Sequence, residues 1–137
     1  MLIYLYTDGA ARGNPGKSAS GYEIYDEKMN LMAKESLYNG IMTNNQAEYT
    51  AVIMALEKVS RELGLENELH IYSDSQLMIR QLKGEYKVKD TELKALHSKA
   101  LKLLRGFKSF TLYNVPRENS HISNVDASLN ELLDSLR

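Results

Sequence analysis

The stretch Leu-Ile-Tyr-Leu-Tyr-Thr-Asp-Gly, residues 2–9, is apolar on both alternations until it reaches Asp8. This pattern is typical of a strand at the buried centre of a sheet, because both faces of such a strand are covered. A second apolar run, residues 69–72, leads in the same way into Ser-Asp-Ser-Gln at 73–76. The sequence therefore predicts two strands that each end in a carboxylate, Asp8 and Asp74.

The remaining elements follow from periodicity and from turn and cap residues. We expect the order βββαβααβα, with strands at 2–8, 21–25, 31–38, 69–72 and 107–115, and helices from 43 to about 63, at 75–82, at 91–104, and from Asn124 or Val125 to 136. Residues 9–16 are expected to form a turn-rich loop, and Asn39-Gly40 to end the third strand. Such an order predicts an α/β fold in one domain, 1–137: a mixed five-stranded sheet, three antiparallel strands then two parallel ones, flanked by helices.

Length and composition exclude several classes of protein. The 137 residues carry ordinary apolar and charged fractions, so disordered and membrane classes are not expected. The chain has no cysteine, which excludes disulfides, thiolate zinc sites and cysteine nucleophiles. We find no signal peptide or membrane-spanning run, and expect a cytoplasmic protein with no membrane association and no obligate protein partner.

Charge is distributed unevenly along the chain. Residues 80–108 carry a net charge of +6, whereas the whole chain carries −1. This basic block can be a surface that follows phosphates, or simply the solvated face of a helix.

Four acidic residues lie at strand ends or helix starts: Asp8, Glu48, Asp74 and Asp126. Glu48 lies one turn before Val52 on the apolar stripe of its helix, so its carboxylate is expected to face inward. Oxygen-only ligands favour Mg²⁺ or Mn²⁺. The four acids thus predict a divalent-metal site of the kind that performs phosphate chemistry.

The motifs around these acids resemble those of the type 1 ribonuclease H family over essentially the whole chain. The similar segments are Thr7-Asp8-Gly9 with Gly13-Asn14-Pro15-Gly16, Thr43-Asn-Asn-Gln-Ala-Glu-Tyr49, Ser73-Asp-Ser-Gln76, and Val115-Pro-Arg-Glu118 followed by Asp126 and Asn130. The loop at 119–124 is about two residues longer than in the family's compact microbial members. The chain also lacks the tryptophan-containing basic handle of longer members, so it resembles the compact, handle-less ones.

The resemblance implies a ribonuclease H-like fold and a metal-dependent endoribonuclease. Such an enzyme hydrolyses the RNA strand of RNA–DNA hybrids with two Mg²⁺ ions, for which Mn²⁺ can substitute, and leaves 5′-phosphate and 3′-hydroxyl ends. Double-stranded RNA is a further possible substrate. Asp8 would bridge the ions, Glu48 and Asp74 would complete one, and Asp126 the other. The alternatives are a catalytically weak nucleic-acid-binding module and a resolvase- or integrase-like nuclease on the same fold.

The resemblance also suggests substrate-binding residues, each with a structural alternative. Asn14, Asn45 and Gln76 would read minor-groove edges and 2′-hydroxyls, or serve loops and caps. Thr43 and Asn44 would grip a phosphate, cap the helix, or both. Arg117 would contact the scissile region or pair with a neighbouring acid, and His121 would assist proton transfer or product release, or be an incidental loop residue. Backbone cations are expected at Lys83, Lys87 and Lys89.

Overall fold

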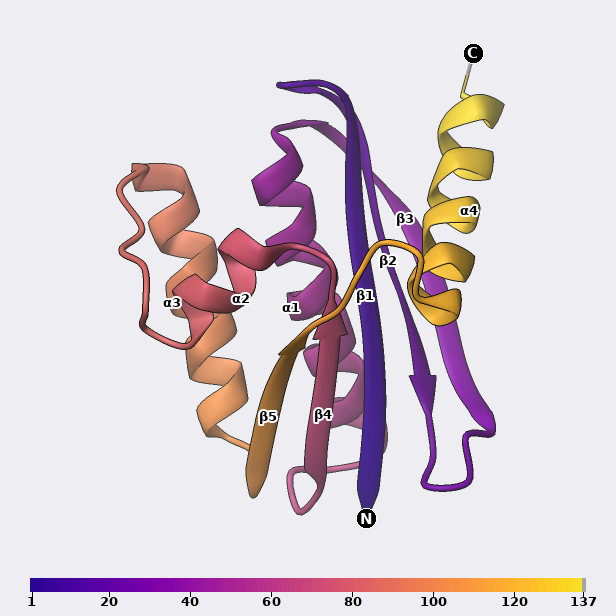
Figure 1. The fold of residues 1–137 in the computed structure, drawn as a ribbon, viewed down its shortest axis with the longest axis vertical. Helices are drawn as coiled ribbons and strands as arrows, with labels where there is room; N and C mark the ends of the chain where they lie inside the picture. Colours follow the sequence, from indigo (N-terminus) through magenta and orange to yellow (C-terminus); the bar gives the residue numbers. More distant parts are fainter. Residues whose placement is uncertain (137) are drawn as a thin grey trace.

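The central strand of the sheet is the one that opens the chain, as its apolar pattern predicts. In the computed structural model, which describes residues 1–136, the strand order is β3-β2-β1-β4-β5 (Figure 1). The strands are β1 (Leu2–Gly13), β2 (Gly16–Tyr25), β3 (Leu31–Met42), β4 (Glu68–Ser73) and β5 (Ser109–Asn114). Pairing is antiparallel between β1, β2 and β3, and parallel from β1 to β4 and β5. The predicted mixed five-stranded sheet is confirmed.

Helices cover the two faces of the sheet unequally. On one face lie α1 (Asn44–Glu62), α2 (Gln76–Leu82) and α3 (Thr91–Arg105), with α1 against β1 and β2 (Figure 1). On the other face α4 (Ser120–Ser135) packs on β1, β2 and β3. The part of that second face formed by β4 and β5 lies beside α4 rather than under it (Figure 1).

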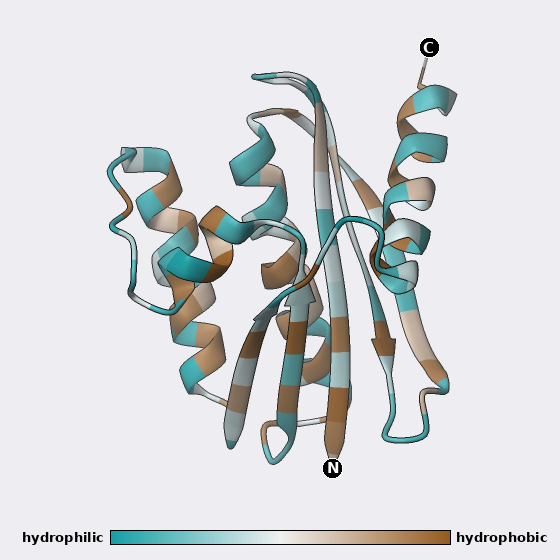
Figure 2. Ribbon diagram, in the orientation of Figure 1, coloured by the Kyte–Doolittle hydropathy of each residue, from teal (hydrophilic) through white to brown (hydrophobic). Residues whose placement is uncertain are grey.

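Each helical layer encloses its own apolar cluster. The larger one lies beneath α1, α2 and α3 and includes the fully buried Ile3, Leu5 and Leu56. The smaller one lies beneath α4, whose buried residues Ile122, Val125, Leu129 and Leu133 follow helical spacing. Figure 2 shows the hydrophobic stretches of β1, β4 and β5 at the end of the sheet near the N-terminus, and more polar colour towards the β1–β2 tip.

Two strands continue beyond their predicted ends. Residues 9–16 are not a loop: β1 and β2 pair as far as Gly13 and Gly16, and only Asn14 and Pro15, joined by a cis peptide bond, form the tip. The positive φ of Gly13, 106°, suits a tight turn that other residues would strain. β3 likewise passes Asn39-Gly40 through a bulge and ends at Met42.

The last helix begins earlier than predicted. It starts at Ser120, not at Asn124 or Val125, because the Asn119 side chain accepts hydrogen bonds from the backbone N–H groups of His121 and Ile122. The expected loop at 119–124 is therefore mostly the first turn of α4.

Over residues 1–136, no helix combines the length and the apolar character needed to cross a lipid bilayer.

Candidate active site

The parallel register of β1 and β4 brings two of the predicted carboxylates together. Tyr4 pairs with His70 and Tyr6 with Tyr72, so Asp8 comes level with Asp74 just past the end of β4. β1 continues beyond this point with β2 as its partner. The centre of the sheet thus opens beside Asp8, at the carboxyl end of β4, which is where α/β sheets commonly bind ligands.

Glu48 reaches the same place from the first turns of α1. A capping box fixes the start of this helix: the Thr43 hydroxyl accepts from Gln46 N, and the Gln46 side chain accepts from Thr43 N. Glu48 is buried, as its place on the apolar stripe predicts. Its carboxylate accepts from Gly9 N at 2.8 Å and from Ser73 Oγ at 3.3 Å.

Gly9 permits this approach of helix to strand. A Cβ built on Gly9 would lie 2.3 Å from the carbonyl carbon of Ala47 and 2.4 Å from the backbone nitrogen of Glu48. Any other residue at this position would force α1 away from β1. The glycine therefore sets how closely Glu48 can approach Asp8.

Three carboxylates form one cluster. Oxygens of Asp8, Glu48 and Asp74 all lie within 4.8 Å of one another. Burial, together with the neighbouring negative charges, raises the pKa of Asp8 to about 7 and that of Glu48 well above its ordinary range. Burial also raises the pKa of Asp74, although the positive charge of Arg117 opposes this.

This donor set fits a divalent cation. Within residues 1–136, no salt bridge joins any of the three carboxylates to a basic side chain. Buried carboxylates without such a partner repel one another. A hard cation with oxygen ligands would relieve that repulsion.

Asp126 lies at the edge of the cluster. It is half-buried on α4, outside the group of three, and it lines the same cavity of about 430 Å³. Asn130, one turn later, donates from Nδ2 to the Asp126 backbone oxygen at 3.1 Å and to its Oδ2 at 3.3 Å.

The structure brings some of the predicted binding residues to this cavity and leaves others outside it. Asn44, Asn45 and Arg117 line the cavity. Asn14 accepts a hydrogen bond from Asn44 N at 3.1 Å and so joins the hairpin tip to the start of α1. The exposed Gln76, Lys83, Lys87 and Lys89 do not line it, and the three lysines lie on the segment between α2 and α3.

His121 does not lie in the loop that the sequence predicts at 119–124. It is in the first turn of α4, and its Nδ1 lies 3.1 Å from the Tyr25 hydroxyl. Its ring also contacts Tyr6, with centroids 4.4 Å apart. His121 is not among the residues that line the cavity of the carboxylates.

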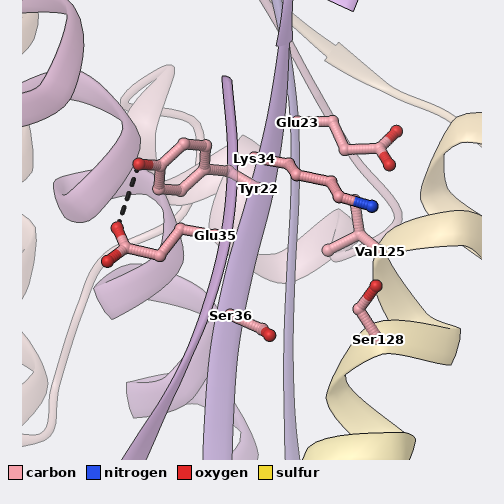
Figure 3. Close-up of a pocket in the computed structure, with 7 residues that line it drawn as sticks. All are labelled: Tyr22, Glu23, Lys34, Glu35, Ser36, Val125 and Ser128. Atoms are coloured by element: carbon pink, nitrogen blue, oxygen red, sulfur yellow. Dashed lines mark hydrogen bonds between the residues drawn. The ribbon is translucent and has the colours of Figure 1, made fainter.

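A second, smaller hollow lies between β2, β3 and α4 (Figure 3). Its volume is about 140 Å³, and its acids are held by tyrosines: Tyr22 donates to Glu35 at 3.0 Å and Tyr25 to Glu23 at 2.6 Å. Lys34 enters the same hollow (Figure 3). This hollow contains a lysine, and its two carboxylates already accept hydrogen bonds. It therefore does not resemble a metal site as the first cavity does.

Sequence reasoning missed two residues in and around the first cavity. Arg12 lines it from β1, although a lone arginine in an expected loop gave no signal. Ser73 donates to Glu48, and its place directly before Asp74 in the third motif is the clue that could have revealed it.

Comparisons with known proteins agree with this geometry. A profile of the family described as reverse transcriptase-like matches residues 6–128. The crystal structure of RNase H1 from the halophilic archaeon Halobacterium salinarum superposes with a TM-score of 0.90 at 36% identity, covering 98% of this chain and 99% of that one. The chain belongs to the type 1 ribonuclease H family.

Two further relatives are similar to nearly all of this chain. LC11-RNase H1, solved in complex with an RNA/DNA hybrid, is 38% identical, with a TM-score of 0.90 and 98% coverage of both chains. The bifunctional protein of Mycobacterium tuberculosis is 30% identical over 98% of this chain. The chain spans only 64% of the curated Halobacterium salinarum ribonuclease HI, to which it is 37% identical, and 36% of the mycobacterial protein.

Proposed function

We propose that this ribonuclease H is a metal-dependent endoribonuclease that cleaves the RNA strand of RNA–DNA hybrids and leaves 5′-phosphate and 3′-hydroxyl ends. The observation that carries the proposal is the cluster of Asp8, Glu48 and Asp74 at the open centre of the sheet. The hybrid-bound structure of LC11-RNase H1, similar over nearly the whole chain, supports the choice of substrate.

Asp8, Glu48, Asp74 and Asp126 would hold two Mg²⁺ ions, with Mn²⁺ as a substitute. When bound, such ions polarise the phosphate and lower the pKa of the attacking water. Asp8 suits a shared ligand because it comes from the central strand and is buried. Glu48 is held in place by Gly9 N and Ser73 Oγ, so its position does not depend on the ion.

The cavity walls would bind the nucleic acid. Asn44 and Asn45 lie at the N-terminal end of α1, where backbone N–H groups and the helix dipole favour phosphate. Asn14 is placed beside them, with its amide oxygen on Asn44 N. Amide side chains can contact 2′-hydroxyls, which distinguish RNA from DNA. Arg117 is an exposed cation at the cavity wall and would contact a phosphate.

The proposal is tested by cleavage of labelled RNA–DNA hybrid, double-stranded RNA and double-stranded DNA in Mg²⁺ or Mn²⁺, with Asp8→Asn in parallel. We expect cleavage of the RNA strand of the hybrid, no cleavage of double-stranded DNA, and loss of activity in the variant. Intact hybrid with the wild-type protein, or equal cleavage by Asp8→Asn, would refute the proposal. The double-stranded RNA lane determines whether that substrate is also cut.

A further inference from the structure

Arg12 connects the β1–β2 hairpin to α4. Its guanidinium forks between two residues one turn apart on that helix. Nη1 lies 2.7 Å from Asp134 Oδ1, and Nη2 donates to the backbone oxygen and Oδ1 of Asn130 at 3.3 and 3.4 Å. Arg12 and Asn130 both line the cavity that contains the carboxylates.

The contact with Arg12 decides which way the Asn130 amide faces. A guanidinium has only donors, so it can engage only the oxygen end of an amide. With Oδ1 turned to Arg12, the Nδ2 group is left to face Asp126, where it donates to Oδ2 at 3.3 Å. This hydrogen bond engages Oδ2, which is one of the two oxygens of that carboxylate.

Asp126 needs such support more than Glu48 does. Glu48 is buried and receives two hydrogen bonds, whereas Asp126 is half-buried at the edge of the cluster. Its helix is held mainly by apolar contacts of Val125, Leu129 and their neighbours. Apolar packing holds the helix in place but does not select the rotamer of a carboxylate.

We propose that Arg12 is a positioning residue that acts through Asn130 to orient Asp126 towards the metal centre. The same contact fastens the hairpin that carries Asn14 to the helix that carries Asp126. This inference rests on the proposed function, because it assumes that Asp126 is a metal ligand. Asp134, paired with Arg12 at 2.7 Å, helps to hold the guanidinium in place.

The first test measures metal binding without nucleic acid. Binding of Mn²⁺ alone is followed by calorimetry and by electron paramagnetic resonance for the wild type, Arg12→Ala, Arg12→Lys and Asn130→Ala. Loss of a residue that orients a metal ligand weakens metal affinity by about 10-fold or more. We expect this loss for one bound ion in both alanine variants. Arg12→Lys should recover little, since an ammonium cannot fork to Asp134 and Asn130 as a guanidinium does.

A matched control separates orientation from charge. Lys17 lies opposite Arg12 in the hairpin register and is exposed. Lys17→Ala removes the same charge from the same hairpin and should leave Mn²⁺ affinity unchanged. Equal losses in Lys17→Ala and Arg12→Ala would overturn the inference.

The second test is a double-mutant cycle. If Arg12 acts through Asn130, the Arg12→Ala/Asn130→Ala double variant should bind Mn²⁺ no more weakly than Asn130→Ala alone. Additive losses would show independent roles and overturn the inference.

A third measurement distinguishes positioning from direct phosphate contact. Arg12 carries a positive charge at the cavity wall, so hybrid affinity in EDTA should fall in Arg12→Ala by no more than it falls in Lys17→Ala. A large drop there, with Mn²⁺ affinity unchanged, would show that Arg12 acts on the substrate and not on Asp126. If the wild type itself neither binds Mn²⁺ nor cleaves hybrid, the proposed function fails; if it does both and Arg12→Ala matches it, only this inference fails.

Discussion

At the scale of single residues, the carboxylate cluster is destabilising until a cation binds it. Asp8 and Glu48 are buried side by side, and both have raised pKa values because burial, and then the negative charges of neighbouring carboxylates, disfavour their charged forms. The hydrogen bonds from Gly9 and Ser73 offset only part of this for Glu48. Metal binding and folding stability are therefore coupled at this site.

The first prediction concerns pH. Well below the ordinary carboxyl pKa of about 4, these acids are protonated in both the folded and unfolded states and have no effect on stability. As pH rises, the unfolded chain ionises first, so the free energy of unfolding falls until pH passes the raised folded pKa of Asp8, about 7. In EDTA, thermal unfolding should therefore show lower stability at pH 8 than at pH 5, and saturating Mg²⁺ should remove most of the difference. A metal-free stability that rises over this range would contradict the prediction.

The second prediction concerns Asp8→Asn. The amide is isosteric but carries no charge, so it should stabilise the metal-free protein at pH 8 by on the order of 3 kcal/mol while abolishing cleavage. Urea unfolding in EDTA measures the gain. Glu66→Gln, on an exposed residue, is the control and should change little. If Asp8→Asn were less stable than the wild type, the Asp8 carboxylate would not be lowering the stability of the metal-free protein.

At the scale of elements, Gly9 determines the distance between β1 and α1. A Cβ added at Gly9 would overlap the backbone of Ala47 and Glu48, so the movement of a flexible side chain could not relieve the clash. The whole start of α1 would have to shift, and Glu48 with it.

The third prediction follows from this contact. Gly9→Ala should destabilise the protein by about 3 kcal/mol through overpacking and should weaken Mn²⁺ binding, because Glu48 moves away from Asp8. Gly106→Ala is the control: Gly106 has an ordinary φ of −75°, and its nearest atom would be 3.3 Å from the new Cβ. Chemical denaturation and calorimetry measure the two effects, and normal metal affinity in Gly9→Ala would count against the prediction.

The start of α4 shows where sequence reasoning stopped. The spacing of Ile122, Val125, Leu129 and Leu133 is helical from the beginning. However, the first turn is largely polar and resembles a loop, so the capping role of Asn119 was missed. The hairpin was missed for a related reason: its outer residues are only partly covered and carry no alternating apolar signal.

In contrast, Asp8, Glu48 and Asp74 could be predicted as a group because buried strand ends and an apolar helix stripe fix where they point. Asp126 joins them only through α4, and the contact that we propose to support it, between Arg12 and Asn130, links residues 118 positions apart.

The fourth prediction follows from the helical setting of His121. Its ring packs against Tyr6 and Tyr25, so His121→Ala should lower the melting temperature while hybrid cleavage below that temperature stays within a few-fold of wild type. Ser123→Ala, in the same turn and exposed, is the control. A variant with unchanged stability but strongly reduced cleavage would restore the catalytic role that the sequence suggested.

At the scale of the whole molecule, charge is divided between regions of opposite sign. The carboxylate cavity lies at the centre of the sheet, while the net charge of +6 falls in residues 80–108, from α2 to just beyond α3. A nucleic acid longer than the cavity could meet both regions. Lys83, Lys87 and Lys89 are the exposed cations closest in sequence to α2.

The fifth prediction tests that surface. Replacing Lys83, Lys87 and Lys89 by Gln together should weaken hybrid binding, and should reduce the slope of log affinity against log salt by about 0.7–0.9 for each phosphate that the protein no longer neutralises. The same change at Lys99, Lys102 and Lys108 alters net charge equally and should have a smaller effect. Binding titrations at several salt concentrations in Ca²⁺ or EDTA make the comparison. Equal effects of the two triple variants would indicate that net charge acts at long range, and not that these lysines form a surface that contacts the nucleic acid.

A row of stacked tyrosines on the sheet face beside α4 provides a spectroscopic signal for the folding of the protein. Tyr6, Tyr72 and Tyr113 stack across β1, β4 and β5 with ring centroids 4.7 Å apart at each step, and the chain has no tryptophan. The near-ultraviolet circular dichroism of the protein should therefore contain a contribution from this row of rings, which exists only when the three strands are in register. Loss of that signal with the far-ultraviolet signal retained would reveal a state in which the helices persist but the sheet has lost its packing. The assembly of the sheet that carries Asp8 and Asp74 can thus be followed without a label.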